Sequence, residues 1–313
     1  MKISILVPAY KATYFKECID SIIEQSYPDW ELIILNDCSP ENLDTIMKHY
    51  HDDRIKYYKN SINVGALDVV NNWNKCLSYA SGDYVICMGD DDKLKTTCLE
   101  EYVRLIKQYP NRYLYHAWTE IIDENSNVIA LQEPRPIEES AYSLLYYRWH
   151  GRKQYIGDFL FETTFLKSNG GFYYMPMAWW SDDISACIAA SKNGVVNSQI
   201  PLFQYRVNSR TLSNTGNVVL KLKASEMFKN WVKDFLECEA TTAVDRVLRK
   251  NLIEEFNEFF LKEKLYKISE DIINNGCSRF LFWLNRNKKY KLTIKSWAFI
   301  IMDVVKRKNK AYV

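Results

Sequence analysis

The chain has 313 residues, of which 47% are hydrophobic and 14% aromatic, so a disordered protein is excluded and a sizeable core is expected. This length predicts one large α/β domain with an appended piece. The net charge of +2 hides an asymmetry, because the residues from Gly276 onward carry ten basic side chains and one acid, Asp303. The basic residues of this tail are Arg279, Arg286, Lys288, Lys289, Lys291, Lys295, Lys306, Arg307, Lys308 and Lys310.

The eight cysteines include no CxxC pair, which argues against a zinc ribbon and a disulfide framework and is typical of a reducing cytoplasm. The N-terminus passes directly into an apolar strand pattern, so we expect no secretion signal. No window holds the roughly 18 apolar residues that a membrane-spanning helix requires. We therefore expect a cytoplasmic protein.

The first part of the chain alternates between strand and helix patterns. Residues 3–7 predict a buried strand, 14–26 a helix and 30–35 a second buried strand, which together form a βαβ unit with parallel strands. Asp37, after the second strand, therefore lies at the same sheet edge as the loop after the first. It either accepts hydrogen bonds from a nucleobase or caps the next helix. The first strand is ended by Pro8, Ala9 and Tyr10.

The alternation continues with a helix over 41–50, a short strand over 55–58, a helix over 66–80 and an apolar strand over 84–88. This order is typical of a doubly wound nucleotide-binding half. The sequence holds neither GxGxxG nor GxxxxGK(S/T). Any phosphates must therefore be held by something other than a glycine-rich cradle.

Gly89 and three consecutive carboxylates, Asp90, Asp91 and Asp92, follow the last of these strands. The carboxyl ends of strands are where open α/β sheets bind ligands. Because adjacent carboxylates repel one another, a hard divalent cation such as Mg²⁺ or Mn²⁺ is their natural partner. The alternative is a solvated acidic turn or a helix N-cap.

A second carboxylate pair, Asp182 and Asp183, opens an apolar helical pattern. The plain alternative to a functional role is an N-cap that interacts favourably with the helix dipole. Around this pair the sequence predicts further elements: a helix over 94–108, strands over 113–118, 159–162 and 201–206, a helix or lid over 144–155 and a short helix over 165–171.

The sequence becomes helical from about residue 218, which predicts a first domain over residues 1–215 and a helical region over 216–313. Apolar and aromatic residues alternate with Lys and Arg over 280–284 and 297–302. This composition predicts amphipathic helices that lie on an anionic membrane surface, on the inner face of the cell membrane. The alternative is a helical bundle with a solvated basic face.

Over residues 1–215 the chain resembles the family 2 glycosyltransferases, because a set of short motifs occurs in that family's order. The resemblance implies a GT-A fold, a Rossmann-like, mostly parallel sheet flanked by helices, and an inverting transferase that uses a nucleotide-sugar donor and a divalent metal. The motifs are Val7-Pro8-Ala9-Tyr10, Asn36-Asp37-Cys38-Ser39, Asn63-Val64-Gly65, Ser81-Gly82-Asp83-Tyr84, Gly89-Asp90-Asp91-Asp92, Gly170-Gly171-Phe172, Asp182-Asp183 and Tyr205-Arg206.

Carried over by position, the resemblance assigns Asp91 to the ribose and the metal, Asp92 to the metal, and Asp183 to the catalytic base. It places Asp182 and Trp180 on the acceptor side. The uridine-binding elements correspond to Pro8, Ala9, Tyr10 and Asp37, and the other donor-side positions are Asn63, Gly65 and Asp90.

Four positions depart from the family pattern. The first acid of the DXD-type motif is Gly89, the Glu of the Glu-Asp pair is Asp182, an expected Arg is Val70, and a His that often follows Tyr205-Arg206 is Asn208. We considered Lys75 and Arg206 as sources of the missing positive charge on the donor side.

These residues suit the chemistry independently of the resemblance. A metal between Asp92 and two phosphates neutralises the charge on a departing diphosphate, and a carboxylate such as Asp183 accepts the proton of an attacking hydroxyl. Together with the resemblance, they predict an inverting, metal-dependent transfer of a sugar, from a UDP-sugar to a glycan or lipid-linked acceptor of the bacterial surface. Two alternatives remain at this stage: a nucleotidyltransferase, and a non-catalytic module that binds nucleotides or carbohydrates. Binding to nucleic acid is not expected.

Overall fold

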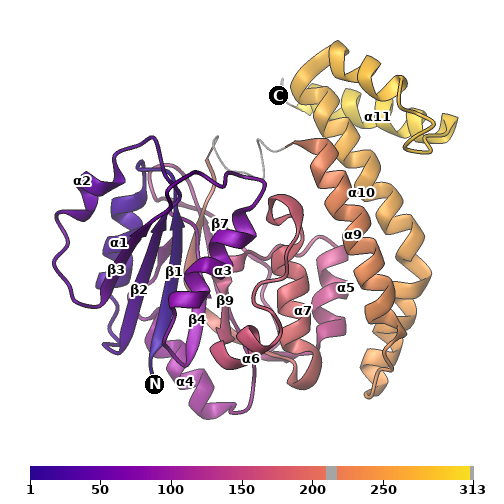
Figure 1. Cartoon of the computed structure of the whole chain (residues 1–313). Helices are drawn as coiled ribbons and strands as arrows, with labels where there is room; N and C mark the ends of the chain where they lie inside the picture. Colours follow the sequence, from indigo (N-terminus) through magenta and orange to yellow (C-terminus); the bar gives the residue numbers. More distant parts are fainter. Residues whose placement is uncertain (209–216, 311–313) are drawn as a thin grey trace. The chain divides into compact units, whose positions relative to one another are not determined.

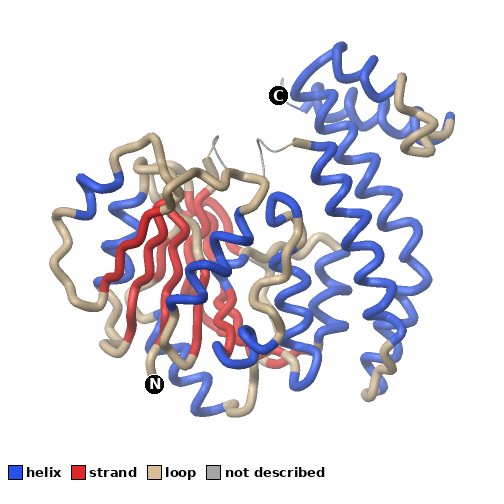
Figure 2. The backbone as a smooth tube through the Cα atoms, viewed as in Figure 1, coloured by secondary structure: helices blue, strands red, loops and turns tan. Residues whose placement is uncertain are grey.

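The computed structural model describes residues 1–208 and 217–310. The chain divides into two compact units, Met1–Thr215 and Gly216–Val313. The domain boundary expected at residue 215 lies outside the described residues. Figure 1 labels the helices and strands, and Figure 2 shows the strands of the first unit gathered in one sheet with helices on both sides.

The N-terminal part of the sheet has the strand order β3-β2-β1-β4, and all three pairings are parallel, as predicted. Nearly every residue of β1 and β2 is buried, because helices cover both faces of parallel strands. The strands are β1 (Ile3–Ala9), β2 (Trp30–Asn36), β3 (Ile55–Lys59) and β4 (Tyr84–Cys87). The helices that connect them are α1 (Phe15–Ile23), α2 (Leu43–Met47) and α3 (Val69–Tyr79).

Strand β1 continues through Pro8 to Ala9, two residues beyond its predicted end at Val7. Its pairing with β4 stops at Leu6, whereas its pairing with β2 continues to Ala9. This end of β1 is therefore paired on one side only, where a proline is tolerated because no ladder bond on the open side is lost.

The rest of the sheet is mixed. Five strand pairings among the described residues are antiparallel and four are parallel, a larger antiparallel share than a mostly parallel sheet implies. The predicted strand over 201–206 is the second half of the longer β10, and three short strands were not expected, because two-residue and solvent-exposed strands lack a hydrophobic pattern. The strands of this part are β5 (Lys93–Leu94), β6 (Leu114–Ile122), β7 (Val128–Leu131), β8 (Glu138–Glu139), β9 (Phe159–Glu162) and β10 (Val195–Arg206).

The predicted helix or lid over 144–155 is divided: α5 (Ala141–Trp149) ends at Trp149, and a loop leads through η1 (Ile156–Asp158) into β9. Asp182 and Asp183 lie in the first turn of α7, immediately after Trp180, which has left-handed backbone angles. The remaining helices of this unit are α4 (Cys98–Gln108), α6 (Thr163–Ser168), η2 (Pro176–Ala178) and α7 (Ser181–Asn193).

The second unit is helical and has its own hydrophobic cluster, centred on residues such as Ile268, Trp283 and Ile300, each fully buried. Its helices are α9 (Val218–Glu237), α10 (Ala243–Leu284), which is interrupted at Gly276, and α11 (Ile294–Lys310). Among the described residues, none of the helices combines the length and the apolar character needed to cross a membrane.

Candidate active site

A cavity of about 940 Å³ opens in the first unit, at the carboxyl ends of β1, β2 and β4. The loops after these strands form one part of its lining, and the loop after α5 and the start of α7 form another. Asp92 and Asp183, which are far apart in the sequence, both line it. The sheet topology therefore brings the two predicted carboxylate groups into one site.

Twelve of the fourteen predicted site residues line this cavity, and two do not. The exceptions are the two cations Lys75 and Arg206. The lining residues from the prediction are Pro8, Ala9, Tyr10, Asp37, Asn63, Gly65, Asp90, Asp91, Asp92, Trp180, Asp182 and Asp183.

The three carboxylates after β4 have different surroundings. Asp90 is buried, and its Oδ2 accepts hydrogen bonds from the backbone N–H groups of Tyr10 (2.6 Å) and Lys11 (2.7 Å), so it ties the loop after β4 to the loop after β1. Asp92 is also buried, and its Oδ1 accepts from the backbone N–H of Arg206 at 2.9 Å. Burial, together with the nearby Asp91, raises the pKa of Asp90 to about 6 and that of Asp92 well above its usual value.

Asp91 is half-buried and is held by two neighbours. Its Oδ2 accepts a hydrogen bond from Asn208 Nδ2 at 2.9 Å and lies 3.2 Å from the Lys11 ammonium. Partial burial works against the charge of Lys11, but the carboxylates of Asp91 and Asp90 outweigh it and raise the pKa of that lysine. Asn208, which stands where the family often has a histidine, thus serves Asp91.

The space beside Gly89 explains why no side chain stands at this position. A Cβ there would lie 2.9 Å from both Asp91 Oδ1 and Asp92 Oδ2, which is closer than real Cβ contacts allow. No side chain among the described residues donates a hydrogen bond to either of these two oxygens, although the backbone of Gly89 also donates to the Asp92 carboxylate. Two carboxylate oxygens that converge on one space, without side-chain donors, fit a divalent cation.

The described residues contain no group of three or more His, Cys, Asp and Glu side chains placed to hold a metal by themselves. Mg²⁺-type sites are usually completed by water and substrate phosphates around one or two carboxylates. Asp91 and Asp92 therefore suit a cation shared with a phosphate-bearing substrate, and they do not form a complete protein cage.

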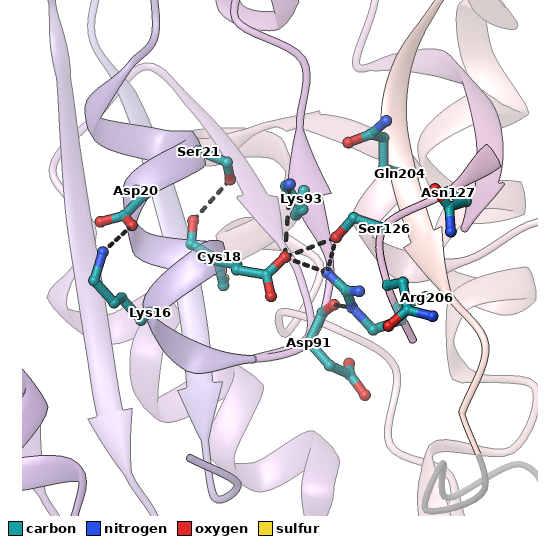
Figure 3. A network of polar contacts seen from close by, with 12 residues as sticks. Lys16, Cys18, Asp20, Ser21, Asp91, Lys93, Ser126, Asn127, Gln204 and Arg206 are labelled. Atoms are coloured by element: carbon teal, nitrogen blue, oxygen red, sulfur yellow. Dashed lines mark hydrogen bonds and ion pairs between the residues drawn. The ribbon is translucent and has the colours of Figure 1, made fainter. Parts of the chain in front are cut away.

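Arg206 supports the acidic loop from behind (Figure 3). Its side chain is fully buried and donates to the Asp91 backbone oxygen (2.8 Å), to Glu17 Oε2 (2.9 Å) and to Ser126 Oγ (3.0 Å). The guanidinium also lies 4.1 Å from the ring centroid of Tyr14. Arg206 therefore does not place its charge on the cavity wall, contrary to our expectation. Its N–H groups are already bound to the Asp91 backbone oxygen, Glu17 and Ser126.

Lys75 does not line the cavity either, and it reaches Asp37 only through Asn60. Its ammonium donates to Asn60 Oδ1 at 2.6 Å, and Asn60 donates to Asp37 Oδ1 at 2.8 Å. Asp37 also accepts from Asn63 Nδ2 (2.9 Å) and from the backbone N–H groups of Val64 (3.0 Å) and Gly65 (3.2 Å). Both oxygens of Asp37 thus accept hydrogen bonds from the loop between β3 and α3. The carboxylate positions this loop in addition to lining the cavity.

Asp183 is buried and fixed by two donors. Its Oδ1 accepts from Arg148 Nε at 2.7 Å and from Gln154 Nε2 at 2.9 Å. The Arg148 guanidinium lies 5.0 Å from the ring of Trp180. Burial and the adjacent Asp183 raise the pKa of Asp182 well above its usual value. The pair is therefore held at the cavity wall in a defined orientation.

The sequence prediction missed several residues that line the cavity: Lys11, Arg148, Lys153, Gln154 and Tyr155. Lys11 directly follows a predicted residue, and the other four belong to the aromatic and basic segment over 144–155 that was noted only as a helix or lid. Tyr155 stacks on Tyr205 with ring centroids 3.6 Å apart. No periodicity marks such contacts, because they join a loop to a distant strand.

The sequence is similar to a known protein family and to several of its members. A family model described as glycosyl transferase family 2 matches residues 4–178. An uncharacterised glycosyltransferase of Rickettsia typhi is 22% identical, over 92% of this chain and 97% of its own length. An Escherichia coli protein named UDP-Glc:alpha-D-GlcNAc-diphosphoundecaprenol beta-1,3-glucosyltransferase is 30% identical over 43% of this chain, and the match spans only 52% of that protein.

The fold has solved counterparts. The structure of S. aureus TarS 1-349 in complex with UDP-GlcNAc superposes with a TM-score of 0.64 and 15% sequence identity, covering 86% of this chain and 81% of that chain. The similarity shows that the two proteins share their fold.

Arg206→Met is expected to lower the free energy of unfolding by about 3 kcal/mol, because it removes a fully buried guanidinium and leaves several of its acceptors unpaired. Arg206→Lys should recover only part of this loss, since an ammonium cannot reach all the acceptors that the guanidinium does. The measurement is urea unfolding. The matched control is Arg104→Met, at an exposed ion pair, which should change stability by less than about 1 kcal/mol. Equal losses in the two Met variants would contradict the role assigned to Arg206.

Proposed function

The chain belongs to glycosyl transferase family 2, and on that basis we propose an inverting, metal-dependent transfer of a sugar from a UDP-sugar to a glycan or lipid-linked acceptor in the synthesis of a bacterial surface polysaccharide. The protein is a glycosyltransferase, which favours this reaction over the nucleotidyltransferase and over the non-catalytic module. The names of an E. coli relative and of the TarS complex include UDP-sugars, which supports the donor. The main observation behind the proposal is the single cavity that Asp91, Asp92 and Asp183 share.

Asp91 and Asp92 would hold Mn²⁺ or Mg²⁺ through the two oxygens that face the space beside Gly89. A divalent ion bound there would neutralise the charge that develops on the diphosphate. Lys11 adds a positive charge from the protein at the same loop, because its ammonium lies 3.2 Å from Asp91. The loop fixed by Asp37 and the residues at the end of β1 would bind the nucleoside.

Asp183 would be the catalytic base that accepts the proton of the attacking acceptor hydroxyl. Arg148 and Gln154 both bind its Oδ1, which restricts the rotation of the carboxylate. A base on the face of the sugar opposite the diphosphate gives attack in line and inversion. One carboxylate is sufficient for this step, unlike the closely spaced pair of a retaining glycosidase. Trp180 and Asp182 would lie on the acceptor side of the base.

Metal-dependent donor binding is the first test. We expect a UDP-sugar to raise the melting temperature of the wild-type protein in the presence of Mn²⁺ and to have little effect in EDTA, because a ligand of the folded state stabilises it in proportion to the logarithm of its concentration over Kd. Asp92→Asn should lose the Mn²⁺-dependent part. Asp29→Asn, an exposed change away from the cavity, is the control. Equal stabilisation with and without metal would refute the metal assignment, and no stabilisation by any UDP-sugar would refute the donor.

The base is tested by Asp183→Asn. This variant should bind a UDP-sugar with Mn²⁺ as the wild type does but transfer the sugar at least about 100-fold more slowly, because it lacks the proton acceptor. Donor binding is measured by thermal stabilisation, and transfer by release of UDP in single-turnover experiments. Transfer at the wild-type rate would reject the assignment, as would a loss of donor binding equal to the loss of transfer.

We also propose that the second unit attaches the enzyme to the inner face of the cell membrane. The outward face of α11 is apolar at i, i+4, i+7, i+8 and i+11, although a helix in a water-soluble bundle usually turns a polar face outward. Ile294 is 90% exposed, and Lys295 and Lys306 border this face. An apolar stripe bordered by lysines suits a surface of anionic lipid. The stripe consists of Ile294, Ala298, Ile301, Met302 and Val305.

The double variant Ile301→Ser with Val305→Ser should lose most of its binding to vesicles of phosphatidylglycerol and phosphatidylcholine, because both residues are about half exposed on the stripe. Co-sedimentation with the vesicles measures this. We chose point substitutions because a deletion of the tail after Gly276 would also remove buried residues such as Trp283 and Ile300. The control is Val244→Ser with Val247→Ser on α10, where two valines are equally or more exposed. Equal vesicle binding by the two double variants would contradict an anchor on α11.

A further inference from the structure

From the loop between α5 and β9, we infer that Lys153, which lines the same cavity as Arg148, forms a binding site for an anionic group of the acceptor, a phosphate or a carboxylate close to the attacking hydroxyl. This inference rests on the proposed function, because it places the acceptor beside Asp183. It narrows the acceptor from any glycan to one that carries a negative charge near the reacting sugar.

The backbone around Lys153 is fixed by buried side chains. Arg152 Nη2 donates to Glu139 Oε2 at 2.8 Å, and Arg135 Nη2 donates to the backbone oxygen of Lys153 at 3.2 Å. Farther along, the backbone N–H of Tyr155 donates to Asp158 Oδ2 at 3.1 Å. Arg135, Arg152, Glu139 and Asp158 are each less than 10% exposed. The segment that lines the cavity is therefore anchored at both ends, which a loop with only a filling role would not need.

The buried arginines and carboxylates of this group carry equal and opposite charges, whereas the charge of Lys153 has no counter-charge. Two arginines face two carboxylates in the group, and Arg152 and Arg135 both approach Glu139. Lys153 is exposed to solvent and lines the cavity, and its ammonium has no hydrogen-bond or ion-pair partner among the described residues. A positive charge held at a cavity wall without a counter-charge attracts anions.

The position of Lys153 indicates which substrate would supply the anion. The next residue, Gln154, donates to Oδ1 of Asp183, as does Arg148. Lys153 therefore directly precedes a residue that binds the proposed base. Of the described residues that line the cavity, three are cationic, and the third, Lys11, is paired with Asp91 on the donor side. Lys11 thus serves the donor diphosphate and Arg148 is paired with Asp183, so Lys153 is left for the molecule whose hydroxyl reaches Asp183.

The test measures the affinity of three small probes for the enzyme saturated with UDP and Mn²⁺, so that the donor site is filled. The probes are glucose 1-phosphate, methyl glucuronide and methyl glucoside, which carry a phosphate, a carboxylate and no charge. At least one anionic probe should bind about tenfold more tightly than methyl glucoside, since hydrogen bonds to charged groups are the stronger ones. The probe that does so identifies phosphate or carboxylate as the source of the charge.

Lys153→Met should reduce that preference to near unity, Lys153→Arg should retain most of it, and Lys107→Met, at an exposed lysine of α4, should leave it unchanged. UDP affinity, measured in a separate titration with Mn²⁺ and no probe, should be equal in all four proteins. The inference is overturned if the wild type shows no preference for either anionic probe, or if the preference persists in Lys153→Met. Failure of UDP to bind the wild type would instead count against the proposed function.

Discussion

Mutual repulsion of carboxylates at the ends of parallel strands is the constraint that organises this site. Asp90, Asp91 and Asp92 follow β4 without a spacer, and burial adds to the cost of charging them, which is why the pKa values of Asp90 and Asp92 are raised. The protein offsets part of this cost with fixed donors: the backbone of Tyr10 and Lys11 for Asp90, the backbone of Arg206 and Gly89 for Asp92, and the side chains of Lys11 and Asn208 for Asp91. The two oxygens without side-chain donors, Asp91 Oδ1 and Asp92 Oδ2, face the same space, so the remaining negative charge is directed to one point.

Maintaining this arrangement requires parts of the chain that are remote in sequence. Arg206, at the end of β10, binds the Asp91 backbone oxygen with its side chain and Asp92 with its backbone N–H, so the strand that closes the sheet also orients the loop after β4. Its guanidinium is balanced by Glu17 of α1. The loop after β4 is thereby fixed by α1, β1 and β10 together, and a local segment of the same sequence would not keep its geometry.

The first four strands and the carboxylate groups could be predicted from the sequence, because buried parallel strands are continuous apolar runs and their carboxyl ends meet at one edge. The direction of β9 and the short strands β5, β7 and β8 could not, since strand direction leaves no trace in composition and two-residue strands have no period. From residue type alone, Lys75 and Arg206 were expected to place a positive charge beside the donor, but neither lines the cavity. Which way a long cationic side chain turns depends on acceptors elsewhere in the fold, here Asn60 and Glu17.

The departures from the family pattern become physically consistent when taken together. With Gly89, the oxygens of Asp91 and Asp92 approach within 2.9 Å of the place a Cβ would take, so a carboxylate at this position would compete with them for the same space. With Asn208, a side-chain amide donates to Asp91 at 2.9 Å and supports one of the two remaining acids. Fewer ligands from the protein leave more of a cation's coordination to substrate oxygens and water. Under the proposed function, the loop would therefore favour a cation that binds tightly only together with a diphosphate, and metal affinity would depend on the donor.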